Sequence, residues 1–204
     1  GPGRRRLPGN SPATARLNRT GPRLRRATAR PTLCPMDSDS TPDSGPIRPT
    51  DDEARTMARD LMARSRFAAL GVVQDGLPVV SRVAFGLAPD GAPASLISML
   101  SQHATALRDA PDASLMIGEP GPRGDPLTHP RLTLQARASF VDHDDPAYEE
   151  MAAHWLRDHP KAKLYIGFGD FHFALFSVTG AFLNGGFGKA FFLTPVDLGL
   201  SEPS

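Results

Sequence analysis

One arginine stands alone on one face of a strand-like segment and is followed by small residues. In residues 77–87, Arg82, Ala84 and Gly86 alternate with a second set that would face a core. That core set is Leu77, Val79, Ser81, Val83, Phe85 and Leu87. Arg82 would hold an anion while a flat ring lies against Ala84 and Gly86. Alternatively, Arg82 is a solvated side chain on a half-exposed strand, and the pattern leaves both interpretations open.

A serine-rich turn follows the next predicted strand and opens a short helix, residues 101–110. Ser101 begins this helix, Ser98 lies just before it, and His103 lies in its first turn. A helix N-terminus presents free N–H groups, which bind anions. A cationic His103 is disfavoured there by the helix dipole unless an anion such as phosphate is bound. The alternative is that Ser101 is an ordinary helix cap.

The other polar residues give weaker signals. Arg131 begins an alternating strand, residues 131–141, whose polar face either lines a pocket or meets solvent. The spacing of the six histidines is not typical of a metal site, and neither a Ser-His-Asp triad nor a carboxylate pair can be assigned. We therefore predict no metal ion, and the residues alone name no catalytic side chain.

Charge is distributed unevenly along the 204 residues, although the formal net charge is only +1. Residues 1–35 contain nine arginines and no acidic residue, while the remainder holds 14 of the 23 basic residues and all 22 acids. Residues 1–49 are also rich in proline and polar residues and lack apolar periodicity. We therefore predict that they form a disordered leader.

Three interpretations of this leader stay open. It is upstream sequence before a true start at Met36, an arginine-rich organelle transit segment, or a basic arm that touches nucleic acid or membrane. No apolar run in the chain is long enough for a membrane span. The single cysteine, Cys34, cannot form an internal disulfide. For the folded domain we expect a cytoplasmic location, with no nucleic acid and no membrane as partners.

Residues 50–198 form the predicted domain, and residues 199–204 form a tail. Helices are predicted from an N-cap at Thr50, at 101–110 and at 146–158, with a short helix or turn at 161–168. Strands are predicted at 67–74, 77–87, 94–99, 113–117, 131–141 and 171–184. The last of these is apolar on both faces, which requires burial on both sides and suggests a subunit interface. The fold class is mainly β with helices (α+β): an antiparallel barrel with packed helices, dimeric by C2 symmetry.

Several short motifs together resemble one known family. They are Ala68–Val72 (AALGV), Pro78–Val83 (PVVSRV), Ser98–Ala104 (SMLSQHA), Asp125–Leu134 (DPLTHPRLTL), Gly167–Phe171 (GFGDF) and Leu183–Ala190 (LNGGFGKA). The chain resembles the pyridoxamine 5′-phosphate oxidase-like FMN-binding split-barrel superfamily, and within it the haem-utilisation (HugZ-type) branch. The resemblance covers about residues 50 to 195.

This resemblance implies a six-stranded antiparallel split β-barrel that dimerises and binds FMN at the subunit interface. Position by position, Arg82 and Val83 match the family's cofactor strand. The phosphate-binding turn is matched by Ser98, Ser101, Gln102 and His103. Arg131 matches a position near the flavin ring.

Departures from the family pattern limit the function. Gln102 and His103 stand where pyridoxamine phosphate oxidases usually carry a basic pair, and their C-terminal arginine-histidine signature is absent. Oxidation of vitamin B6 is therefore not expected. Lys189 stands where the haem-utilisation branch commonly has an arginine.

Three functions compete. The first is an FMN-dependent oxidoreductase that acts on a small-molecule substrate. The second is a haem-binding or haem-degrading protein, with His103, His129 and His172 as candidate ligands. The third is a cofactor-free dimeric module.

Overall fold

The computed structural model describes residues 47–202, so nearly all of the predicted leader lies outside the described residues. The strands are β1 (Ile47–Arg48), β2 (Phe67–Gln74), β3 (Leu77–Ala84), β4 (Gly86–Leu87), β5 (Pro93–Ser98), β6 (Asp112–Ile117), β7 (Arg131–Val141), β8 (Phe171–Asn184) and β9 (Ala190–Leu193). The helices are α1 (Asp52–Arg64), α2 (Gln102–Asp109) and α3 (Tyr148–Asp158), with 3₁₀ turns η1 (Pro126–Thr128), η2 (Pro160–Leu164) and η3 (Val196–Leu198).

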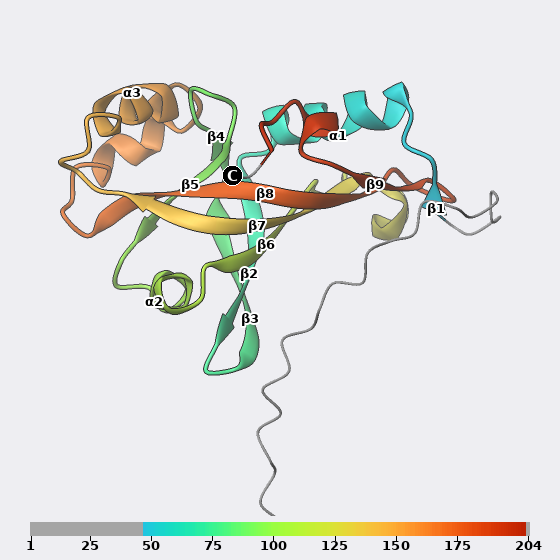
Figure 1. Ribbon diagram of the computed structural model, residues 1–204. Coiled ribbons are helices and arrows are strands. Elements are labelled where there is room, and N and C mark those ends of the chain that lie inside the picture. The colour runs from blue at the N-terminus through green and yellow to red at the C-terminus, as the bar shows by residue number, and fades with distance from the viewer. Residues whose placement is uncertain (1–46, 203–204) are drawn as a thin grey trace, which may run out of the picture. The chain divides into compact units, whose positions relative to one another are not determined.

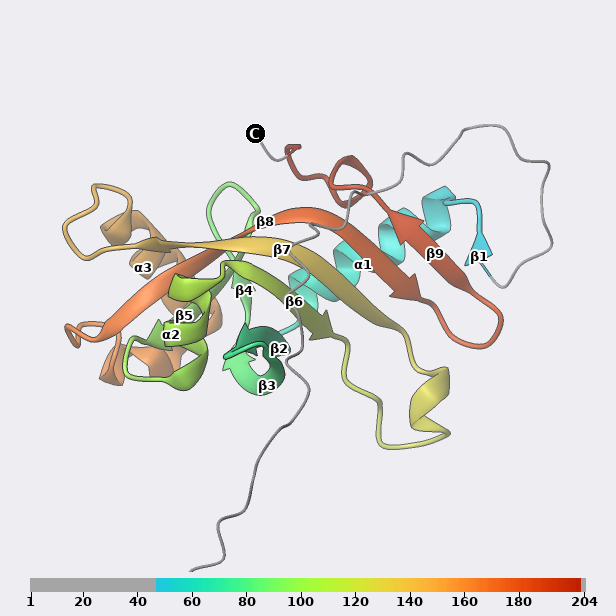
Figure 2. The same cartoon turned by 60° about the horizontal axis from the view of Figure 1, so that its bottom comes forward.

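The strands form one strongly curled, mainly antiparallel sheet (Figures 1 and 2). Its order is β1-β9-β8-β7-β6-β2-β3, and β5 joins β8 along the first half of that strand. β4 continues β3 and pairs with β5. The residue pairs Gly86–Ala94 and Leu87–Pro93 therefore close the sheet into a ring. β3 and β5 share no ladder pairs beyond that junction in the described part of the chain. These features confirm the predicted split barrel.

α1 forms as its apolar stripe predicts, but its cap differs. Ala54, Ala58 and Met62 are buried against the sheet. The carboxylate of Asp51, not the hydroxyl of Thr50, caps the helix by accepting a hydrogen bond from Ala54 N at 2.7 Å. Thr50 Oγ1 donates instead to Phe192 O of β9 at 2.5 Å. The predicted cap at Thr50 was therefore wrong by one residue, because a distant strand takes up that hydroxyl.

The interior of the barrel is one apolar core, and both α1 and α2 bury residues in it. Figure 1 shows the two helices at separate places along the curled sheet. A second core lies outside the first half of β8, where α3 and η2 cover it. This explains why Phe173 and Ala174, which point to opposite faces, are both fully buried. The pairing of β7 with β8 skips one residue at Thr179, so inward-facing positions change from Val178 to Ala181.

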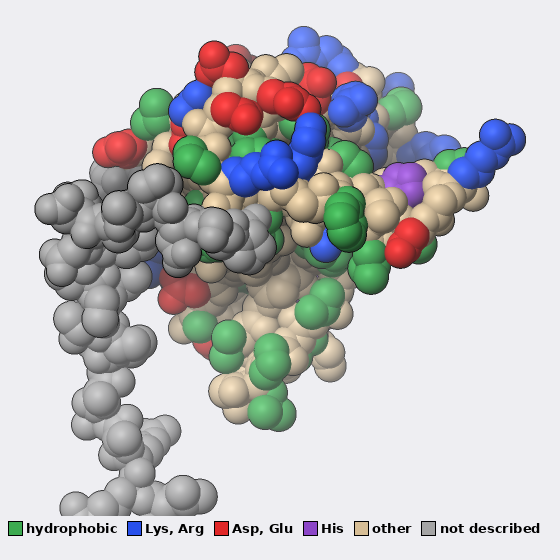
Figure 3. All heavy atoms as spheres, turned by 90° about the vertical axis from the view of Figure 1, so that its right-hand side faces the viewer, with side chains coloured by type: hydrophobic (Ala, Val, Ile, Leu, Met, Phe, Trp, Pro, Cys, Tyr) green, Lys and Arg blue, Asp and Glu red, His purple; other side chains and the backbone are tan. Residues whose placement is uncertain are grey.

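The β2–β3 hairpin extends beyond the barrel and exposes apolar side chains (Figures 1 and 3). Its turn, Asp75-Gly76, has positive φ at both residues, a conformation that an Asp-Gly pair favours in two-residue hairpins. Leu77 and Val80, near the tip, are 67% and 70% exposed. The prediction that Leu77 faces the core was wrong, because no element of the described chain covers the hairpin tip. Val83 and Phe85, closer to the barrel, are buried as predicted.

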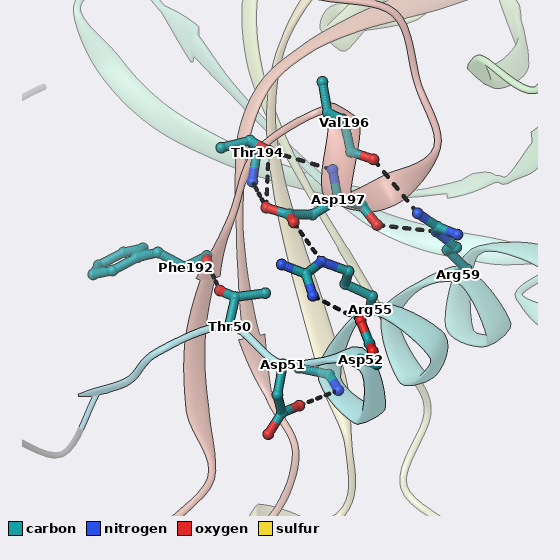
Figure 4. A network of polar contacts seen from close by, with 10 residues as sticks. Thr50, Asp51, Asp52, Arg55, Arg59, Phe192, Thr194, Val196 and Asp197 are labelled. Atoms are coloured by element: carbon teal, nitrogen blue, oxygen red, sulfur yellow. Dashed lines mark hydrogen bonds and ion pairs between the residues drawn. The ribbon is translucent and has the colours of Figure 1, made fainter.

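A polar network ties the C-terminal segment to α1 (Figure 4). Asp197 accepts hydrogen bonds from Thr194 N at 2.9 Å and from Arg55 Nε at 2.7 Å. Arg59 Nε donates to the Asp197 carbonyl at 2.9 Å. Hydrogen bonds from Thr194, together with the Arg55 guanidinium, lower the pKa of the Asp197 carboxyl. The segment after β9 is therefore held against α1 by a carboxylate that must stay ionised.

Replacing Asp197 by alanine is expected to lower the free energy of unfolding by about 1 kcal/mol at neutral pH. In the folded protein the pKa of Asp197 lies below its ordinary value of 3.8. The contribution of its carboxylate to stability is therefore complete above pH 3.8 and is lost as the pH falls through the pKa of the folded state. Urea titrations from pH 7 to pH 2 would measure it. Asp52→Ala is the control, because Asp52 also contacts Arg55 but is 99% exposed. An equal loss in both variants would contradict the prediction.

Candidate functional site

Arg82 lies on the outer face of β3, in a shallow apolar groove. It pairs with Ala69 of β2, and its guanidinium carbon lies 5.1 Å from the centre of the Phe67 ring. Within the described residues, no carboxylate forms an ion pair with it. The groove has a volume of about 200 Å³ and is also lined by Met116 and Glu119. Arg82 therefore offers a cation beside an aromatic ring, with Glu119 in the groove but not in an ion pair with it.

The face that follows Arg82 is already covered by a flat ring of the chain itself. A Cβ on Gly86 would lie 2.9 Å from the Trp155 indole and 3.2 Å from the His159 ring. The predicted place for a cofactor ring against Gly86 is therefore filled by α3. The neighbouring Val83 points into the barrel and is buried, so only its backbone faces the region of Arg82.

The serine turn is a tightly hydrogen-bonded structure. Ser98 Oγ donates to Asp170 Oδ2 at 2.6 Å and accepts from Leu100 N at 3.2 Å. Ser101 Oγ donates to Ser98 O at 2.7 Å and accepts from Ala104 N at 3.3 Å, which confirms the predicted cap of α2. Both hydroxyls are thus hydrogen-bonded within the turn. The part of the turn that remains for a ligand is the N-terminus of α2, which these bonds hold in place.

That helix end has free N–H groups, and the first turn of α2 carries no acidic residue of its own, although the Asp170 carboxylate lies in the preceding turn on Ser98. The contacts of the described residues include no acceptor for Gln102 N or His103 N. The first turn of α2 holds no acidic residue, whereas α1 and α3 each carry two acids there. Burial lowers the pKa of His103, so its imidazole is neutral near pH 7. The start of α2 therefore has the electrostatic character of an anion site.

Arg131 supports a neighbouring loop. Its terminal nitrogen donates to Leu127 O at 3.0 Å and to His129 O at 3.4 Å, which fixes the η1 segment against the start of β7. Figure 2 shows this segment beside the β8–β9 turn. A Cβ on Gly186 of that turn would lie 2.9 Å from Thr128 O.

The predicted site residues fall into two groups that approach from neighbouring strands. β4, which continues β3, runs antiparallel to β5. The end of β5 at Ser98 therefore lies toward the part of β3 that carries Arg82. Ser95 Oγ donates to Ala84 O at 2.5 Å and bridges the two strands where their ladder stops. The groove beside Arg82 is not lined by Ser98 or by any residue of α2. Within one chain, the two groups are therefore near each other but do not share a cavity.

Two contributors were missed from the sequence. Phe67 is the diagonal neighbour of Arg82, and the two-residue turn at Asp75-Gly76 fixes that register, so hairpin geometry would have found it. Asp170, the partner of Ser98, follows 72 residues later. Only the pairing of β5 with β8 brings it there, and no local signal indicates that pairing.

Comparisons with known proteins agree with this architecture. The family model described as "CREG, beta-barrel" matches residues 49–197. No curated protein matches the chain. One solved structure is 40% identical, covers 74% of this chain and 98% of its own, and has a TM-score of 0.68.

Two further solved structures carry descriptions. A protein of unknown function from Agrobacterium tumefaciens is 33% identical, with a TM-score of 0.62, over 72% of this chain and 60% of its own. A haem-binding protein from Mycobacterium smegmatis is 29% identical, with a TM-score of 0.66, over 76% of this chain and 62% of its own. This chain thus spans about three-fifths of the length of each of these two.

The family match extends over most of the chain, and the curled sheet with its open β3–β5 seam is the corresponding fold. None of the helices among residues 47–202 is long and apolar enough to cross a membrane. The chain belongs to the CREG β-barrel family, within the FMN-binding split-barrel superfamily that includes the pyridoxamine 5′-phosphate oxidase-like proteins.

Proposed function

We propose that this protein binds FMN as a homodimer and acts as an oxidoreductase that does not oxidise vitamin B6. The observation that carries the proposal is the N-terminus of α2, whose first turn holds no acidic residue and which follows β5, a strand in contact with the Arg82 strand β3. Free N–H groups at Gln102 and His103 supply hydrogen bonds for a phosphate, and Arg82 supplies the positive charge.

The described residues fit a flavin phosphate better than they fit the whole cofactor. Ser98 and Ser101 shape the turn, Val83 contributes backbone, and Arg131 orders the adjacent loop. The groove beside Arg82, at about 200 Å³, is smaller than most small-molecule sites. Bound FMN would supply electron transfer, while the protein binds and orients it. A second copy of the chain would have to complete the ring-binding part.

The outer face of the sheet is the surface that we assign to the second copy. Cross-strand pairing aligns Arg82, Ala69, Met116, Thr133, Phe182 and Phe192 in one row across six strands. Met116 and Phe192 in this row are 47% and 60% exposed. Aligned apolar side chains of this kind are typical of protein interfaces. Because Arg82 belongs to the row, a partner on this face would enclose the groove.

Replacing Arg82 by alanine is expected to weaken FMN binding by about 10- to 100-fold, since it removes a charge-assisted hydrogen bond to phosphate. Quenching of flavin fluorescence on titration with apoprotein would measure the dissociation constant. Arg108→Ala, in the last turn of α2, is the matched control because it removes an exposed arginine far from that helix's N-terminus. Equal affinities in the wild type and Arg82→Ala would exclude Arg82 from the site.

Haem binding is the second candidate function, favoured by the Mycobacterium smegmatis relative and by one histidine. Both ring nitrogens of His129 are engaged, with Gly121 N and Arg123 O. In His172, Nε2 contacts Gly169 O, and Nδ1 lies 3.0 Å from Asp142 Oδ1 without hydrogen-bond geometry. Of the three candidates, only His103 has both ring nitrogens without a partner among the described contacts.

If haem is the ligand, His103→Ala is expected to abolish the Soret shift seen when haemin is added to the wild type, because burial keeps the imidazole neutral and able to bind iron. His129→Ala is the control and should retain the shift. Absorbance titrations with FMN and with haemin on the same preparation would separate the two functions. A protein whose spectrum responds to neither ligand would instead be a cofactor-free module.

A further inference from the structure

A cleft of about 480 Å³ opens where α1 ends and β2 begins. Its floor is apolar and is formed by Met57, Leu61, Phe67 and Pro130. This volume falls within the range of ordinary small-molecule sites. The cleft also shares Phe67 and Glu119 with the groove beside Arg82, so the two hollows adjoin.

The rim of this cleft carries one arginine with uncommitted donors. Arg64 uses Nε to contact Asp60 O at 3.1 Å, and its NH2 is 4.0 Å from Asp60 Oδ2, too far for a hydrogen bond. Arg66, the second rim arginine, is occupied: it donates to Ala63 O at 2.8 Å and to Asp158 at 3.3 Å. The terminal nitrogens of Arg64 are therefore available, and a guanidinium matches the two oxygens of a carboxylate.

One further residue shapes the wall of the cleft, and another restricts the charge of its ligand. Gly118 has a φ of +98°, and a Cβ there would lie 2.6 Å from Pro130 O, so this part of the wall cannot carry a side chain. Glu119 is exposed at the edge and forms no ion pair within residues 47–202. Its negative charge disfavours a ligand with several anionic groups. One anion on an apolar body is the chemistry that satisfies both the floor and the rim.

We propose that this cleft binds an apolar monocarboxylate, with its chain on the Met57–Leu61 floor and its carboxylate at Arg64. The proposal does not rest on FMN binding, because the cleft is complete within one chain and lies beside the groove of Arg82. Flavin-free protein can therefore test it, and a failure here would leave the FMN proposal untouched.

The probe is 1-anilinonaphthalene-8-sulfonate, an apolar monoanion whose fluorescence rises in apolar sites, displaced by decanoate. Decanoate should displace it at lower concentration than decanol or decylamine. Arg64→Gln should weaken decanoate binding about three- to tenfold, whereas Arg64→Lys should retain part of it and Glu119→Gln should strengthen it. Arg108→Gln, an exposed arginine outside the cleft, should change nothing.

Thermal unfolding of each variant would establish that it is folded. The proposal is overturned if decanol competes as well as decanoate, or if a folded Arg64→Gln binds decanoate like the wild type. Light scattering would report the oligomeric state at each protein concentration. If the fluorescent probe binds the monomer but not the dimer, a second copy covers the cleft and the proposal is overturned. Stronger decylamine binding would assign the cleft to a cation through Glu119.

Discussion

Replacing Gly118 by alanine is expected to lower the free energy of unfolding by about 3 kcal/mol or more. Two penalties combine at this position. The φ of +98° disfavours any residue with a Cβ, and that Cβ would lie 2.6 Å from Pro130 O and 2.9 Å from the Arg131 Cα. Both contacts are with backbone, which cannot rotate away. The link between β6 and the η1 loop would therefore have to move.

Gly91→Ala separates the two penalties. Gly91 has a φ of +90°, close to that of Gly118, but nothing lies within 4 Å of a Cβ built there. It should lose only the conformational part, about 1 kcal/mol. Urea unfolding of both variants gives the steric part as the difference between them. Similar losses in the two variants would show that the loop after β6 yields easily and does not hold Arg131 and the proposed cleft in place.

Elements with a local cause were predictable from the sequence. β2, β7 and β8 begin and end at the predicted residues, because alternation defines β7, and apolar runs bounded by turn residues define β2 and β8. α1 follows its apolar stripe, and Ser101 caps α2 as expected. The exposure of Leu77 was not predictable, since alternation shows which face a residue occupies but not whether another element reaches it.

The candidate site shows the same division. The strand of Arg82 and the helix end after Ser101 follow from short-range patterns. The engagement of Ser98 by Asp170 and the cover of Gly86 by Trp155 depend on contacts between segments far apart in the chain. For this reason the sequence located the helix end after Ser101 correctly but did not reveal that Trp155 covers Gly86.

Replacing Trp155 by alanine is expected to cost about 3–5 kcal/mol of unfolding free energy, the range for losing a large buried aromatic side chain. Trp155 is 2% exposed and stacks on His159 with ring centres 4.1 Å apart. It also packs edge-on against Phe173 and covers Gly86. Its loss would open a cavity over β4, the short strand that closes the barrel.

Trp155→Phe is the control, because it retains a ring over Gly86 and removes a buried indole N–H that has no hydrogen-bond partner among the described residues. It should cost clearly less than alanine. Urea unfolding would rank the two variants. If alanine and phenylalanine cost the same, contact with Gly86 would not be what stabilises this part of the molecule.

Trp155→Ala should also change how the stability of the protein depends on pH. Burial lowers the pKa of His159, while its Nε2 contacts Phe85 O at 2.9 Å. Stability from the neutral ring is therefore complete above the ordinary value of 6.5 and declines as pH falls toward the lowered folded value. Trp155→Ala exposes the ring, so NMR titration should show the His159 pKa moving up toward 6.5, with less loss of stability between neutral and mildly acidic pH. An unchanged pKa would mean that elements other than Trp155 keep His159 from water.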